Sequence, residues 1–124
     1  MTDPQMNQFQ RAAQLWSLLV LAARNQQILS YRTVQHLTRM ERVGIGKVCL
    51  GPIFAYCKAH KLPWLTVLVV EERTGLPGDS FINAAKREYG KTVSIFELQS
   101  RVFAYDWFKE KAPTPEAFKS ACSP

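Results

Sequence analysis

The chain has 124 residues and a hydrophobic fraction of 47%, which fits one folded domain and excludes a disordered chain. Its formal net charge is +6, and its three cysteines form no CxxC pair, which is typical of a protein from a reducing cytosol. The first residues lack the pattern of a signal peptide, and the longest apolar run, residues 15–23, is shorter than the roughly 20 residues that span a bilayer. We therefore expect a soluble, cytoplasmic protein with no membrane partner.

The positive excess lies entirely in the first half of the chain. Residues 1–61 contain eight Lys or Arg against two acids, whereas residues 62–124 contain eight of each. Such an asymmetry favours a polyanionic partner, nucleic acid before membrane. The alternative is a basic protein that its charge merely keeps soluble.

Apolar periodicity predicts helices through the first half. A stripe at helical spacing predicts a central, mostly buried helix over residues 3–24. Ser30 is a good N-cap for a second helix with its apolar face over residues 31–37. A third helix is expected from about Gly44, and Pro52 must either kink that helix or open a new one. This order of elements is that of a helix-turn-helix domain.

One strand is predicted over residues 65–72, where LTVLVVEE is rich in β-branched residues and a glycine-rich turn follows. Its candidate partner strand is residues 79–82. A strand and turn directly after the third helix are typical of a winged helix. We therefore expect a mainly α fold with a small β element (α+β). It has a winged helix-turn-helix-like core over residues 1–80, and a helical C-terminal extension over residues 81–124 that packs on the same domain.

The extension carries an aromatic face between Phe96 and Phe108, made of Phe96, Val102, Phe103, Trp107 and Phe108. We expect this face to pack back onto the domain. A surface for a protein partner is the alternative.

Several patterns that bear on chemistry are incomplete. Gly44, Gly46 and Gly51 do not have the spacing of a phosphate loop or a dinucleotide loop, and they follow a helix rather than a strand. They instead let a helix N-terminus approach another helix or a phosphate closely. Cys57 and His60 have CxxH spacing, but a zinc site needs about four ligands and the sequence offers no convincing remainder. No cofactor or metal is expected.

A metal-dependent nuclease is the third function to consider. Glu71 and Glu72 end the predicted strand, which is where such enzymes place acidic ligands. The only acids upstream are Asp3 and Glu41, and Arg73 stands where a lysine is usual. We therefore expect no enzymatic activity.

The basic helices remain as the candidate functional surface. Their long hydrogen-bond donors can reach phosphates and base edges, and few acids lie nearby. A solvated helix face is the alternative reading. The candidate DNA-contacting residues are Tyr31, Arg32, Gln35, Arg39, Arg42 and Lys47.

The order SY, RVG, LGPI, LPW, LVV and GLPG over residues 30–78 resembles the DNA-binding domain of the alkylguanine-DNA alkyltransferases. It is closer to their inactive relatives, the alkyltransferase-like proteins. That family uses a winged helix-turn-helix to bind the minor groove and to flip a damaged base into a pocket. The resemblance implies that Tyr31 stands for the family's phosphate-rotating tyrosine. It also implies that Arg42 stands for the arginine that fills the gap in the base stack.

The same resemblance implies that Pro63 and Trp64 occupy the positions of the family's conserved motif proline and of the cysteine that accepts the alkyl group. Leu65 and Thr66 replace the histidine and arginine that follow, so alkyl transfer is not expected. Trp64 is a candidate pocket residue, with a place in the core as the favoured alternative. Whether Arg42 inserts into a groove or only begins a helix is left open by the sequence.

The function predicted from the sequence is non-catalytic binding of double-stranded DNA through a basic helix-turn-helix surface. The alternative is a protein-interaction module of the immunity, antitoxin or adaptor type that uses the Phe96–Phe108 segment.

Overall fold

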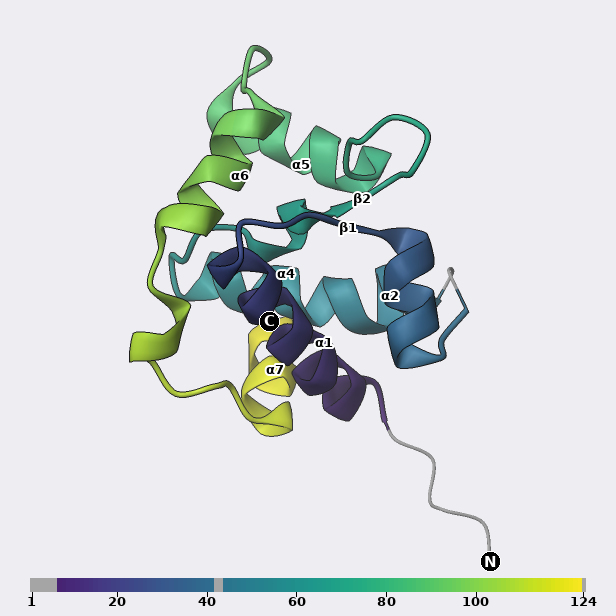
Figure 1. The fold of residues 1–124 in the computed structure, drawn as a ribbon. Coiled ribbons are helices and arrows are strands. Elements are labelled where there is room, and N and C mark those ends of the chain that lie inside the picture. The colour runs from purple at the N-terminus through teal and green to yellow at the C-terminus, as the bar shows by residue number, and fades with distance from the viewer. Residues whose placement is uncertain (1–6, 42–43, 124) are drawn as a thin grey trace, which may run out of the picture.

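The computed structural model describes residues 7–41 and 44–123. This part of the chain is mainly helical with one small sheet (Figure 1), which confirms the predicted class of a mainly α fold with a small β element. The α-helices are α1 (Gln8–Arg24), α2 (Tyr31–Thr38), α4 (Gly51–Ala59), α5 (Asp79–Tyr89), α6 (Ile95–Ala104) and α7 (Pro115–Cys122). A π-helix covers Ile45–Leu50, and 3-10 helices cover Leu65–Leu68 and Trp107–Lys109. The two strands are β1 (Leu29–Ser30) and β2 (Val69–Val70).

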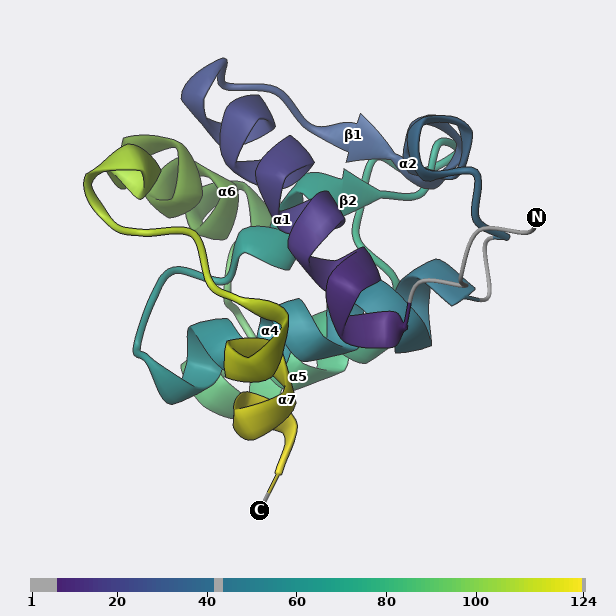
Figure 2. The same ribbon diagram turned by 90° about the horizontal axis from the view of Figure 1, so that it is seen from below.

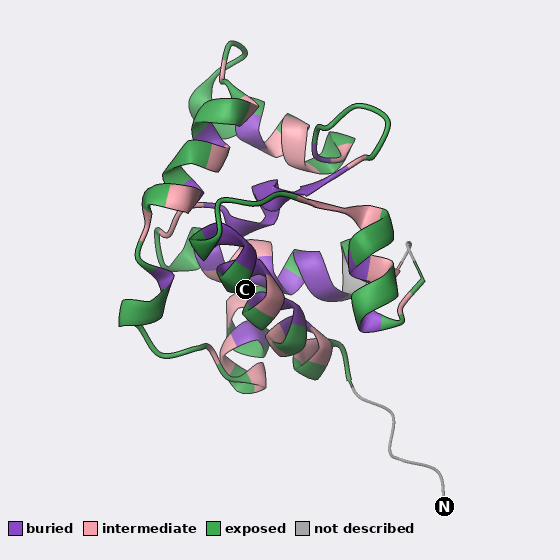
Figure 3. Ribbon diagram, viewed as in Figure 1, coloured by how far each residue is buried: buried purple, intermediate pink, exposed green. Residues whose placement is uncertain are grey.

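Helix α1 is the centre of the fold, as its apolar stripe predicts. It begins after Asn7, whose side chain accepts hydrogen bonds from the backbone N–H groups of Phe9 and Gln10. Seven of its residues are buried, and Figure 3 shows this helix among the buried elements. Predicted helix residues 3–6 lie outside the described residues. Among the described helices, none combines the length and apolar character needed to cross a bilayer.

The predicted strand over residues 65–72 is wrong for most of its length. Leu65–Leu68 is a 3-10 helix, and only Val69–Val70 is a strand. This segment is almost completely buried and packs against α1, α4 and α6, so no neighbouring strand lies along it. Its backbone groups bond locally instead, as Val67 N–H does with the carbonyl oxygen of Trp64 at 3.0 Å.

The partner strand also differs from the prediction. β2 pairs in parallel with β1, with Leu29 opposite Val69 and Ser30 opposite Val70. Residues 79–82, the predicted partner, form the first turn of α5 instead. Gly78 is the N-cap of this helix. The carboxylate of Asp79, in the first turn, interacts favourably with the positive end of the helix dipole.

Pro52 lies in the first turn of α4. The helical run does not break before it, because Leu50 and Gly51 both have right-handed helical dihedrals, so α4 continues the π-helix directly. The preceding π-helix ends where the N–H of Gly51 donates to the carbonyl oxygen of Gly46. Short π-helical turns are frequent at functional sites.

The C-terminal part packs on the same core. α7 lies against α1 and α4, and α6 lies against the 3-10 helix Leu65–Leu68 (Figures 1 and 2). The sequence boundary placed at residue 80 falls inside α5. Trp16 of α1 is the centre of an aromatic cluster, with ring centroids 5.5 Å from Tyr56, 5.6 Å from Trp107 and 5.8 Å from Phe118.

Candidate nucleic-acid interface and adjoining pocket

Helix α2 is capped at its N-terminus and bonded to α1 at its C-terminus. Ser30 Oγ accepts a hydrogen bond from the N–H of Thr33 at 3.1 Å, which confirms the predicted N-cap. At the other end, Arg11 Nη1 of α1 donates to the carbonyl oxygen of Thr38 at 3.0 Å. Val34 and Thr38 are the buried residues of this helix. The opposite face is therefore presented to solvent in a fixed orientation.

The exposed face of α2 carries positive and polar groups. Arg32 and His36 are exposed, and Gln35 is half-buried. The helix itself contains no acidic residue. Arg39 is also exposed, but it lies one residue beyond the helix as its C-cap, with a φ of 57°. Arg39 thus lies at the end of the helix, next to the exposed face rather than on it.

Arg32 has an acidic neighbour that its position in the sequence did not reveal. Its Nε lies 3.4 Å from Oε2 of Glu72, which follows β2. The two side chains are 81% and 60% exposed, so solvent screens this pair. Exposed ion pairs contribute about 0–1 kcal/mol, and the guanidinium can exchange its partner at little cost.

Two of the predicted contact residues cannot be placed on this face. Arg42 lies outside the described residues. Lys47 belongs to the π-helix Ile45–Leu50 by its backbone, and its side chain is not among those described. Tyr31 is half-buried at the start of α2 and lines a pocket.

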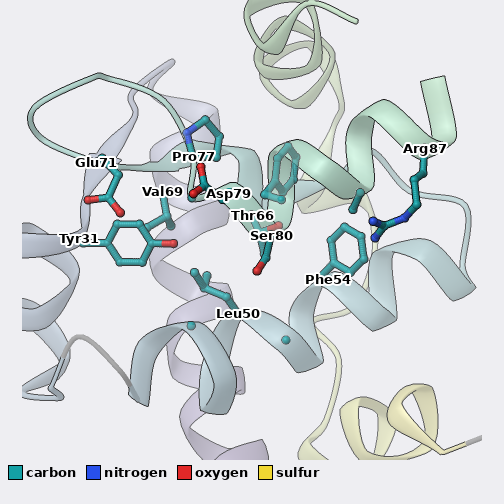
Figure 4. A pocket seen from close by; sticks show the side chains of 15 residues that line it. Tyr31, Leu50, Phe54, Thr66, Val69, Glu71, Pro77, Asp79, Ser80 and Arg87 are labelled. Atoms are coloured by element: carbon teal, nitrogen blue, oxygen red, sulfur yellow. The ribbon is translucent and has the colours of Figure 1, made fainter. Parts of the chain in front are cut away.

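This pocket, which sequence reasoning missed, has a volume of about 600 Å³ (Figure 4). Four separate segments form it: the start of α2, the junction of the π-helix with α4, the 3-10 helix with β2, and α5 with the turn before it. Only the GLPG turn, which contributes Pro77 and Gly78, was a visible signal in the sequence. The lining residues are Tyr31, Gly46, Leu50, Gly51, Phe54, Thr66, Val69, Glu71, Pro77, Gly78, Asp79, Ser80, Phe81, Ala84 and Arg87.

Thr66 is the unusual polar residue of this pocket. It is 5% exposed, and its Oγ1 is the one buried side-chain oxygen or nitrogen in the described part of the chain that lacks a hydrogen-bond partner. A buried hydroxyl without a partner costs about 1–3 kcal/mol. Such a group in a native structure calls for an explanation.

Replacing Thr66 with valine is therefore expected to raise the free energy of unfolding by about 1 kcal/mol, because the change removes an unpaired hydroxyl and keeps the shape. Thr38→Val is the matched control. Thr38 is also buried, but its Oγ1 donates to the carbonyl oxygen of Val34 at 2.7 Å, so its loss is expected to lower stability. Urea unfolding of both variants measures the difference. A loss of stability in Thr66→Val would mean that this hydroxyl has a partner in solution.

Trp64 belongs mainly to an aromatic cluster. It is 6% exposed, and its ring centroid lies 4.7 Å from Phe54, 5.8 Å from Phe81 and 5.2 Å from Tyr89. It does not line the large pocket. One edge borders a smaller hollow of about 200 Å³ beside Lys61 and Arg101.

The cysteines lack the features of a reactive or metal-binding site. Burial raises the pKa of the Cys57 thiol to about 12, and a backbone hydrogen bond from Leu65 offsets part of that rise. Burial likewise raises the pKa of Cys49 to about 11, with the charge of Arg11 opposing it. His60 is exposed and packs on the Tyr56 ring at 4.1 Å. Among the described residues, His, Cys, Asp and Glu form no group of three or more that could hold a metal ion.

The aromatic face of the C-terminal segment divides into two sets. Val102 and Trp107 are buried, and Trp107 Nε1 donates to the carbonyl oxygen of Val102 at 2.8 Å. Phe96 and Phe108 are instead 77% and 60% exposed. The expectation that the whole face packs onto the domain is therefore wrong for these two phenylalanines. Both rings are mostly exposed to solvent in the free protein.

No protein-family model, curated protein or solved structure matches this chain.

Proposed function

We propose that this protein binds double-stranded DNA without catalysing a reaction, through the exposed face of α2 and its surroundings. The observation that carries the proposal is the exposure of Arg32, His36 and Arg39 on or beside a helix that contains no acid. Lysine and arginine contacts to phosphates supply most of the affinity of such surfaces. Arg42 and Lys47 stay candidate contacts on the basis of the sequence alone.

The proposal includes a helix-turn-helix form of the domain, with the two-residue pairing of β1 and β2 in place of the predicted wing. In it, α2 is the first helix of the unit, and the π-helix with α4 is the second. The resemblance of residues 30–78 to the DNA-binding domain of the alkylguanine-DNA alkyltransferases supports this assignment. Trp64, in place of the reacting cysteine, supports binding without alkyl transfer.

A salt titration tests the proposal directly. Fluorescence anisotropy with a labelled duplex is expected to show an affinity that falls about 40-fold between roughly 50 and 200 mM salt, if three phosphates are contacted. The Arg32→Gln/Arg39→Gln variant should bind more weakly and show a shallower salt dependence. Lys111→Gln/Lys119→Gln is the matched control, since it removes the same charge from exposed residues around α7, away from α2 in Figures 1 and 2. Absence of binding at low salt, or equal losses in both variants, would contradict the proposal.

The Arg32–Glu72 ion pair allows a second test, in which a substitution is expected to strengthen DNA binding rather than weaken it. Glu72→Gln removes a negative charge beside Arg32, so DNA affinity at low salt is expected to rise about two- to fivefold. Glu97→Gln is the control, because Glu97 also forms an exposed ion pair, with Arg101 at 2.9 Å on α6. The same anisotropy assay measures both. An equal gain in the two variants would show only the effect of net charge.

A second candidate function rests on the exposure of Phe96 and Phe108, which suits a surface for a protein partner. The salt titration separates the two candidates. Contacts made by two phenylalanine rings do not weaken as salt rises, whereas phosphate contacts do.

A further inference from the structure

The large pocket has charges of opposite sign at its two ends. Figure 4 shows Tyr31 and Glu71 at one end and Arg87 at the other, with Asp79 nearer the Glu71 end. Asp79 and Arg87 both belong to α5 and are eight positions apart, which corresponds to about 12 Å along a helix. The lining carries two carboxylates and one guanidinium, so this pocket is acidic within a basic protein.

The wall between these ends is largely apolar. Leu50, Phe54, Val69, Phe81 and Ala84 line it. Gly46 and Gly51 also line the pocket, and a Cβ added at Gly46 would meet nothing within 4 Å. Apolar side chains of a ligand therefore find both contact surface and room.

Two kinds of hydrogen-bond donor along the pocket are available to a ligand. The hydroxyl of Thr66 is one of them. The first turn of α5 supplies others, because its N-cap, Gly78, offers no side chain and a helix leaves its first N–H groups unbonded. Ile82 is the first residue of α5 whose N–H donates back, to the carbonyl oxygen of Gly78 at 3.1 Å. Asp79, Ser80 and Phe81, which precede it, all line the pocket.

We propose that this pocket binds a free peptide of about three residues in an extended conformation, with its ammonium group near Glu71 and Asp79 and its carboxylate at Arg87. Three extended residues span about 10 Å, which matches the separation of the charged ends. Peptide carbonyls accept from Thr66 and from the first turn of α5, and apolar side chains fill the space between Phe54 and Phe81. A single amino acid does not fit this arrangement, because its two charges are adjacent. The proposal does not rest on the proposed DNA surface, although Tyr31, a candidate DNA contact, also lines the pocket.

Glycine amide signals give a direct test, since they occupy a separate region of a ¹H–¹⁵N NMR spectrum. Gly46, Gly51 and Gly78 line the pocket, whereas Gly44, Gly75 and Gly90 do not. Tri-leucine with free ends is expected to shift the first set and leave the second in place. N-acetylated and C-amidated tri-leucine should each bind about tenfold more weakly, because each lacks one charge-assisted contact. No shifts at the pocket glycines, or equal binding by either capped peptide, would overturn the proposal.

Variants test the carboxylate end of the pocket and the Thr66 hydroxyl. Arg87→Gln is expected to weaken tri-leucine binding about tenfold and to abolish the preference for a free carboxylate. Lys86→Gln is its control, since Lys86 is exposed on the same helix and does not line the pocket. Thr66→Val should lower the affinity while leaving the protein folded. Thermal unfolding of each variant confirms the fold. Equal affinity of Arg87→Gln and Lys86→Gln for tri-leucine would overturn the assignment.

Discussion

Trp16→Ala is expected to lower the free energy of unfolding by about 3–5 kcal/mol, which is a large part of the 5–15 kcal/mol typical of a domain. Trp16 is 6% exposed and contacts rings from three later segments, at Tyr56, Trp107 and Phe118. Its removal leaves a cavity that these rings cannot all fill, because each belongs to a different element. Urea unfolding followed by circular dichroism measures the change.

Leu21→Ala is the control on the same helix. Leu21 is 53% exposed, so its truncation is expected to change the stability by less than about 0.5 kcal/mol. A similarly small change in the two variants would mean that the aromatic cluster around Trp16 contributes little to the stability.

Stability is expected to fall steeply in alkaline solution because of the buried thiols. In the unfolded chain a cysteine ionises near its ordinary pKa of about 8.5, but burial raises the pKa of Cys57 to about 12 in the folded protein. The folded state therefore has its full stability below about pH 8.5 and loses it as the pH rises towards 12. For Cys57 alone the loss between about pH 8 and 11 is on the order of 2–3 kcal/mol.

Denaturant unfolding across this pH range tests the effect. Cys57→Ala has lower stability at every pH, because it creates a cavity, but its alkaline decline is expected to be shallower than that of the wild type. Cys122→Ala is the control: burial raises the pKa of Cys122 as well, but this residue is exposed, so its loss should change the decline less than the loss of Cys57 does. Parallel declines in the wild type and Cys57→Ala would show that other groups cause it.

The sequence predicted those features that depend on local chemistry. The helix α1 follows from its apolar stripe, and the start of α2 from Ser30. In each case the decisive residues lie within one element, so neighbours in the chain carry the information.

The segment at residues 65–72 was mispredicted because its conformation depends on distant neighbours. Its β-branched residues favour a strand, but β1 supplies only two residues for pairing, and helices surround the rest. The Thr66 hydroxyl and the charges of Glu71 and Arg87 meet around one pocket only after four distant segments pack together. The spacing of residues within a single motif therefore does not predict this pocket. The pairing of Arg32 with Glu72 was missed for the same reason.

The packing of α7 against α1 has a consequence for the order of events during synthesis. Trp16 leaves the ribosome early, while Phe118, which covers one side of its ring, is far away in the sequence and is translated much later. Until then, the nascent chain exposes an aromatic surface that the finished protein buries, and such surfaces promote aggregation and chaperone binding. Premature termination before α7 should therefore produce a chain that cannot complete its hydrophobic core, even though all residues of α2 are present.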